Sequence, residues 1–140
     1  LSQENNTMST ERSAASVIGW QKNDAKSLTE KLYPLARKFE IEHELDDLPN
    51  ILSEDYEHLF TKSMSNDLKE ICKKFEIEIV AGSDGSESGS WYFGFGIPYV
   101  DGKPVSDFLT LVHDLSTVLK NSVEGIEISE PKVYNVVSWF

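Results

Sequence analysis

The sequence contains no recognisable nucleophile motif. The only cysteine, Cys72, lies beside Lys73 and Lys74, and neighbouring cations can lower the pKa of a thiol. The alternative is a small core residue, which we favour because residues 68–75 have a helical apolar pattern. The chain also lacks the Gly-x-Ser-x-Gly motif that positions the serine nucleophile of many hydrolases. We therefore expect no catalytic residues and no enzyme activity.

Metal ligands are equally scarce. The three histidines, His43, His58 and His113, do not have the short ligand spacing of a zinc site. The loop at residues 83–90 is rich in Ser, Asp, Glu and Gly, but it lacks the ordered ligands and the closing Glu of a calcium loop. We expect neither a bound metal nor a cofactor.

The strongest feature is the acidic segment, by which we mean residues 40–57. No Lys or Arg occurs between Phe39 and Thr61. Concentrated like charge produces a negative potential that can guide and hold a basic partner, although an ordinary solvated surface is the alternative interpretation. The carboxylates of the segment are Glu40, Glu42, Glu44, Asp46, Asp47, Glu54, Asp55 and Glu57. The leading hypothesis is a small non-enzymatic interaction protein of the inhibitor, immunity or anti-defence type, which binds a basic protein surface.

A second candidate surface belongs to an expected strand at residues 91–99. Alternation places its large apolar side chains on one face, which we assign to the core, and Tyr92, Gly94 and Gly96 on the other. Glycine weakens a strand interior and often marks the close approach of another backbone or a ligand. The alternative function is therefore a small-molecule binding module, as a monomer or a homodimer, that uses this face.

Charge and composition restrict the partners. The net charge of −11 over 140 residues disfavours nucleic acid and anionic membrane surfaces. No apolar run reaches the ~18 residues of a membrane span, and the first ten residues lack a signal-peptide pattern. A single cysteine permits no internal disulfide. We expect a cytoplasmic protein with a basic protein partner, and the apolar end at Trp139 and Phe140 adds homodimer formation as an option.

Hydrophobic periodicity predicts the secondary structure. Helices are expected at residues 10–20, 24–39, 53–60, 65–74 and 106–120. Strands are expected at residues 75–80, 91–97, 126–128 and 133–140, and the first two should form an antiparallel hairpin. Asp24 and Ser106 are the expected N-caps of two helices, and Pro34 predicts a kink or a restart. The residues 40–47 fit a strand, a helix or a loop.

These elements predict an α+β fold with N-terminal helices and a C-terminal antiparallel sheet of three to four strands. The helix at 106–120 should cover the apolar face of that sheet, giving a two-layer sandwich. A chain of this length fits one domain, which we place at residues 10–140. Residues 1–9 are expected to be a disordered tail, in part vector-derived because Met8 fits a native start.

Overall fold

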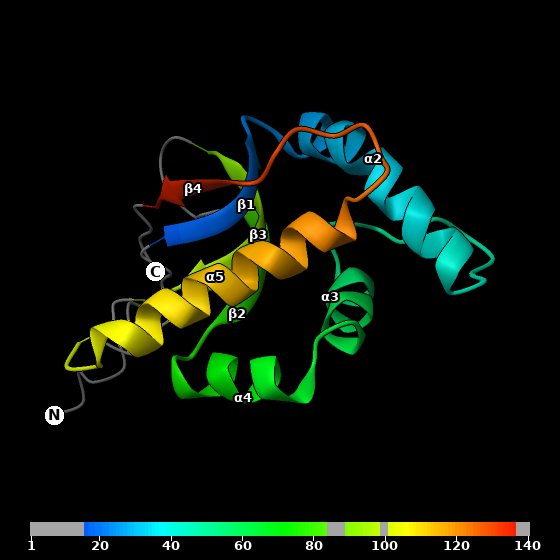
Figure 1. Cartoon of the computed structure of the whole chain (residues 1–140). Coiled ribbons are helices and arrows are strands. Elements are labelled where there is room, and N and C mark those ends of the chain that lie inside the picture. The colour runs from blue at the N-terminus through cyan, green and yellow to red at the C-terminus, as the bar shows by residue number, and fades with distance from the viewer. Residues whose placement is uncertain (1–15, 84–88, 99–100, 137–140) are drawn as a thin grey trace, which may run out of the picture.

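In the described part of the chain, four strands form one antiparallel sheet, and four helices pack on one side of it (Figure 1). The computed structural model describes residues 16–83, 89–98 and 101–136. The strand order is β2-β3-β1-β4, so the first strand along the chain lies inside the sheet. The elements in chain order are β1 (Ser16–Lys22), α2 (Ala25–Glu42), α3 (Glu54–Lys62), α4 (Asn66–Lys74), β2 (Glu78–Ser83), β3 (Trp91–Ile97), α5 (Val105–Ser122) and β4 (Lys132–Asn135).

The α+β class is confirmed, but the expected order of helices first and sheet last is wrong. Residues 16–22 form β1, where we expected the end of a helix at 10–20, and residues 10–15 lie outside the described part. The β-branched and aromatic residues of β1 favour a strand. Because both faces of β1 are buried, its sequence lacks a clear alternation and resembles a short piece of buried helix.

The other helices lie close to their expected positions. Asp24 is the N-cap of α2, and its Oδ1 accepts a hydrogen bond of 2.8 Å from the Ser27 N–H. α2 continues through Pro34 without a restart. α5 begins one residue early with Pro104 at its N-cap, so Ser106 lies within its first turn and does not cap it. Local signals therefore sufficed for the helices.

The strands differ more from expectation. β2 begins at Glu78 because residues 75–77 end α4, with Glu76 in a left-handed backbone conformation at φ 57°. Its antiparallel pairing with β3 is confirmed. Residues 126–128 belong to no strand, and β4 is only a short strand. The continuation expected at 137–140 lies outside the described residues.

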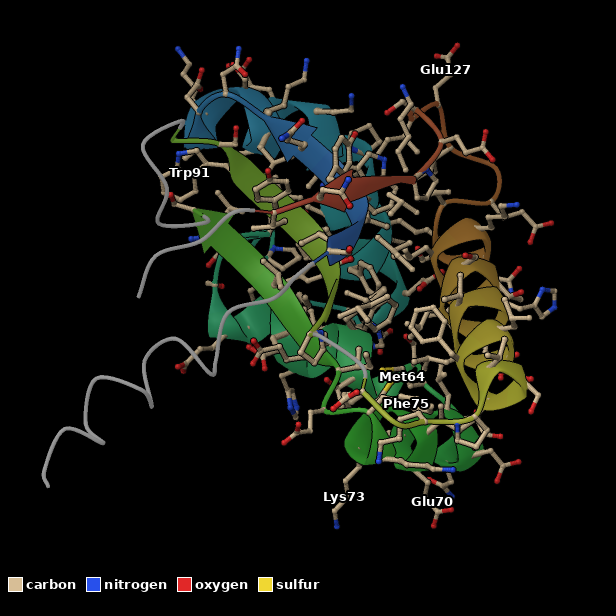
Figure 2. The ribbon with its side chains drawn as sticks, turned by 90° about the vertical axis from the view of Figure 1, so that its left-hand side faces the viewer. Met64, Glu70, Lys73, Phe75, Trp91 and Glu127 are labelled. Carbon is tan, nitrogen blue, oxygen red and sulfur yellow. The ribbon has the colours of Figure 1, made fainter. Side chains whose placement is uncertain are left out.

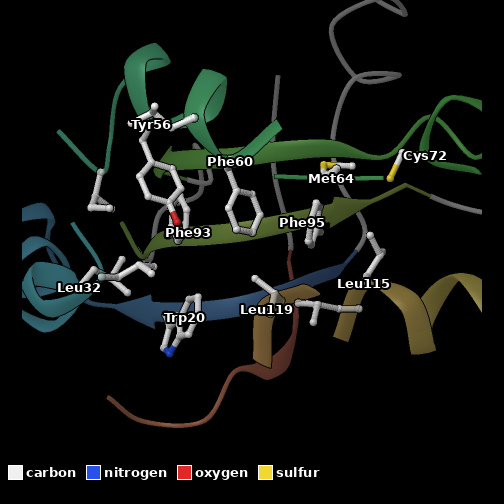
Figure 3. Packing of buried hydrophobic residues seen from close by; sticks show 14 of the residues in the cluster. Trp20, Leu32, Tyr56, Phe60, Met64, Cys72, Phe93, Phe95, Leu115 and Leu119 are labelled. Atoms are coloured by element: carbon white, nitrogen blue, oxygen red, sulfur yellow. The ribbon is translucent and has the colours of Figure 1, made fainter. Parts of the chain in front are cut away.

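The core lies between the sheet and the helices, and β3 provides its centre. Phe93 and Phe95 are fully buried on the helix side. Tyr56 and Phe60 of α3 pack against them, with the ring centroids of Tyr56 and Phe93 only 4.3 Å apart (Figure 3). Three leucines on one side of α5 close the layer. The apolar patterns of the strand at 91–97 and the helix at 106–120 predict eight core residues. Five of them are buried, namely Phe93, Phe95, Ile97, Leu111 and Leu115, and three are partly buried, namely Trp91, Phe108 and Val118.

The backbones of β1 and β3 come into close contact at two glycines. Gly19 and Gly94 lie opposite each other in the strand register. A Cβ atom on Gly94 would lie 2.1 Å from the Ile18 carbonyl oxygen, and one on Gly19 would lie 2.0 Å from the Phe93 carbonyl oxygen. No side chain fits at either position, so this strand pair requires glycine on both sides.

We expect Gly94→Ala to lower the free energy of unfolding by about 3 kcal/mol, because the new methyl group must force β1 and β3 apart. Gly82→Ala is the matched control. Gly82 has the same φ of 154° as Gly94, but nothing lies within 4 Å of its Cβ position. Urea unfolding followed by tryptophan fluorescence measures both variants, and equal losses would contradict the role of the close contact.

The Tyr56 hydroxyl is buried without a hydrogen-bond partner in the structure, and burial raises the pKa of this phenol well above its usual value. Since a buried unpaired hydroxyl costs about 1–3 kcal/mol, Tyr56→Phe should leave the free energy of unfolding unchanged or raise it. Tyr92→Phe is the comparison, because the Tyr92 hydroxyl accepts a hydrogen bond of 2.9 Å from Gln21 Nε2. It should cost about 1 kcal/mol. A larger loss for Tyr56→Phe than for Tyr92→Phe in urea unfolding would refute this account.

Candidate functional site

The acidic segment lies at the end of α2, in the connection to α3 and in the first turn of α3. Figure 1 shows this connection at the end of the molecule remote from β4. The residues 40–47, whose conformation the sequence left open, are helical to Glu42, turn at residues 43–44 and then run without regular structure. Five of the eight carboxylates therefore lie in the last turn of α2 or just after it, and the other three lie in the first turn of α3.

Most of these carboxylates face solvent and lack a cation. Glu40 is the exception, with its side chain only 18% exposed and an Arg37 nitrogen 2.8 Å from its Oε1. Glu42 lies 3.9 Å from Lys38 Nζ, but that ammonium group also donates to the Ser122 carbonyl oxygen at 2.9 Å, at the end of α5. The other six carboxylates form no ion pair within the described part of the chain, and all six are exposed. The segment therefore presents uncompensated negative charge.

Helix stability accounts for only part of this charge. Glu54, Asp55 and Glu57 lie in the first turn of α3, where negative charge is favourable because of the helix dipole. Glu40 and Glu42 lie in the last turn of α2, at the negative end of the helix dipole, and this turn has no basic residue. Carboxylates there are unfavourable with respect to the dipole, although each lies within ion-pair distance of a cation about one turn earlier, Arg37 for Glu40 and Lys38 for Glu42.

α2 ends in a Schellman motif with a glutamate where glycine is usual. The Leu45 N–H donates to the Glu40 carbonyl oxygen at 3.0 Å, and the Glu44 N–H donates to that of Ile41 at 3.4 Å. Glu44 has a left-handed backbone with φ 51°, which is unfavourable for a residue with a side chain. A carboxylate is therefore retained here at a cost in stability.

Two apolar side chains are exposed among the acidic residues. Ile41 is 66% exposed and Leu48 is 38% exposed. Apolar anchors surrounded by polar residues are typical of protein interfaces, because the anchor is desolvated on binding and the rim excludes water. Neither residue stands out in the sequence, because a lone apolar side chain is normally assigned to the core.

The second candidate surface has an explanation within the fold. The group closest to Gly94 is the backbone of β1, and Gly96 pairs with Val17 on one side and Glu78 on the other. Tyr92 is only 3% exposed, and its ring contacts that of Tyr134 with centroids 5.9 Å apart. The close approach of another backbone, which the glycines predicted, is at Gly94 the contact with the neighbouring strand β1.

The remaining candidates for chemistry are dispersed. Cys72 is buried, and burial raises its thiol pKa to about 11, so the expected core role fits better than activation by neighbouring lysines. His43 stacks on Phe39, whereas His58 and His113 are exposed. Among the described residues, no group of three or more His, Cys, Asp or Glu side chains could hold a metal ion.

Comparison with known proteins gives no relative. No family model matches the chain, and neither a curated protein nor a solved structure shows significant similarity to it. None of the described helices has the length and apolar character needed to cross a membrane. Any function must therefore be argued from the surfaces themselves.

Glu44→Gly should raise the free energy of unfolding by about 1 kcal/mol, because glycine adopts the left-handed conformation without a steric penalty. Glu76→Gly should do the same, since Glu76 ends α4 in an equivalent motif at φ 57°. Thermal and urea unfolding of both variants would check this expectation. If either variant were less stable than the wild type, the glutamate would have a stabilising contact that the backbone argument omits.

Proposed function

We propose that the protein is a small, acidic, non-enzymatic interaction protein that binds a basic protein surface through the acidic segment. An inhibitor, immunity or anti-defence role is the sharpest form of this proposal. The observation that supports it is the set of six exposed carboxylates that form no ion pair in the described part of the chain, in the same segment as the exposed side chains of Ile41 and Leu48.

In the proposed mechanism, the carboxylates act on the association rate and the exposed apolar side chains act on the dissociation rate. The unpaired carboxylates increase the association rate with a basic partner, an effect that salt screens. Ile41 and Leu48 then lose their contact with water in the complex and slow its dissociation. By covering a basic cleft, such a protein would block the access of an anionic substrate to that cleft. We place this activity in the cytoplasm, in keeping with the single cysteine.

The alternative, a small-molecule module or homodimer that uses Tyr92, Gly94 and Gly96, has less support. It depended on an unexplained close approach at the glycines, and β1 already accounts for that at Gly94. The alternative stays a prediction without an observation in its favour.

The test is a pull-down from the source cell at low salt, with the bound proteins identified by mass spectrometry. We expect a basic protein that is released by a high-salt wash. The variant Glu42→Gln, Glu44→Gln, Asp46→Asn and Asp47→Asn should weaken its binding about tenfold or more, mainly through slower association. Glu40 is left unchanged because it is ion-paired and only 18% exposed.

The matched control removes the same number of charges elsewhere, at the exposed residues Glu70, Glu76, Glu124 and Glu127, each changed to Gln. It should bind the partner nearly as well as the wild type. If both variants lost affinity equally, net charge alone would explain the binding. If neither lost affinity, the acidic segment would not be the interface.

A further inference from the structure

In the described part of the sheet, β2 is an edge strand with few of the features that discourage pairing in its middle. Among the described strands it pairs only with β3, so every second residue directs its backbone N–H and C=O away from the sheet. The opposite edge strand, β4, is short and carries Lys132 after Pro131, and both features discourage added strands. The middle of β2, residues 79–82, is Ile-Val-Ala-Gly and contains neither a charge nor a proline.

A groove lies beside the start of this edge. It is a cavity of about 350 Å³ between α3, α4 and β2. Its apolar lining includes Met64, Cys72 and Phe95 from the core (Figure 3), together with Ile77 just before β2 and Ile79 within it. A bulky apolar side chain could enter it, and a strand added to β2 places every second side chain on this side of the sheet.

Two lysines line the same groove. Lys69 and Lys73 are four residues apart and so share one face of α4, and Figure 2 shows Lys73 pointing away from the core. Both are exposed, and neither forms an ion pair in the described part of the chain, although acidic residues outnumber basic ones 24 to 13. Glu57 and Glu78 lie on the other sides of the groove, so its positive charge is confined to the α4 side.

We infer that the groove between α4 and β2 binds an extended peptide segment of a partner protein. The segment adds to the sheet as a strand beside β2 and places one apolar side chain in the cavity. An acidic residue or a terminal carboxylate next to that side chain contacts Lys69 and Lys73. This binding site goes beyond the proposed function, because it selects acidic rather than basic chemistry and shares only Glu57 with the acidic segment.

The test begins with a phage-displayed library of random peptides of about ten residues, selected on the full chain. The variant Lys69→Glu with Lys73→Glu serves for counter-selection. We expect enriched peptides with alternating apolar residues and at least one Asp or Glu. By fluorescence polarisation, they should bind this variant about tenfold more weakly than the wild type. Lys62→Glu is the matched control, because Lys62 is exposed but does not line the groove, and it should leave the affinity within about twofold.

Strand addition can be tested by changing the peptide alone, because only the backbone amides that face β2 would pair with it. N-methylation of every second residue of an enriched peptide removes either the amides facing β2 or those facing solvent. We expect one methylation pattern to abolish binding and the other to preserve it. The inference would be overturned by a selection that enriches no such peptides, by equal loss with both patterns, or by full affinity for the double variant. A stable dimer in light scattering that free peptide cannot dissociate would also overturn it, since a second copy would then fill the edge.

Discussion

The fold depends on the close contact of Gly19 and Gly94, where the backbones of β1 and β3 leave no room for a side chain. β1 provides the site at which β4 pairs, and Trp20 of β1 donates its indole N–H to the Ser129 carbonyl oxygen at 2.8 Å. The chain between α5 and β4 is therefore positioned by β1 as well. A single methyl group at this contact would affect the sheet on both sides of β1.

One-sided layering explains how a molecule with this much charge remains compact. The helices bury their apolar faces on one face of the sheet, and Lys38 joins α2 to the end of α5. The acidic segment lies beyond this core, where its carboxylates do not have to be desolvated. Charge at that end can change with little effect on packing, which leaves it open to selection for binding.

The sequence predicted what is encoded locally. Asp24 caps α2 as expected, and the regular leucine spacing of the helices depends on neighbouring residues only. β1 was missed because its partners lie far away in the chain, and Gly19 gains its meaning only opposite Gly94. The charge of the acidic segment was visible in the sequence, whereas the exposure of Ile41 was not. The groove beside β2 combines residues from several elements, so no local pattern could indicate it.

The place of β1 in the sheet also has a consequence for synthesis. Ser16 pairs with Ile97 and with Asn135, so the strand made first needs partners that leave the ribosome much later. Helices α2, α3 and α4 can form as they emerge, but β1 must remain unpaired until β3 is available. The apolar residues of β1 therefore lack their native strand partners while the chain from α2 to β2 is made. The sheet can close around β1 only after β3 and β4 have been made.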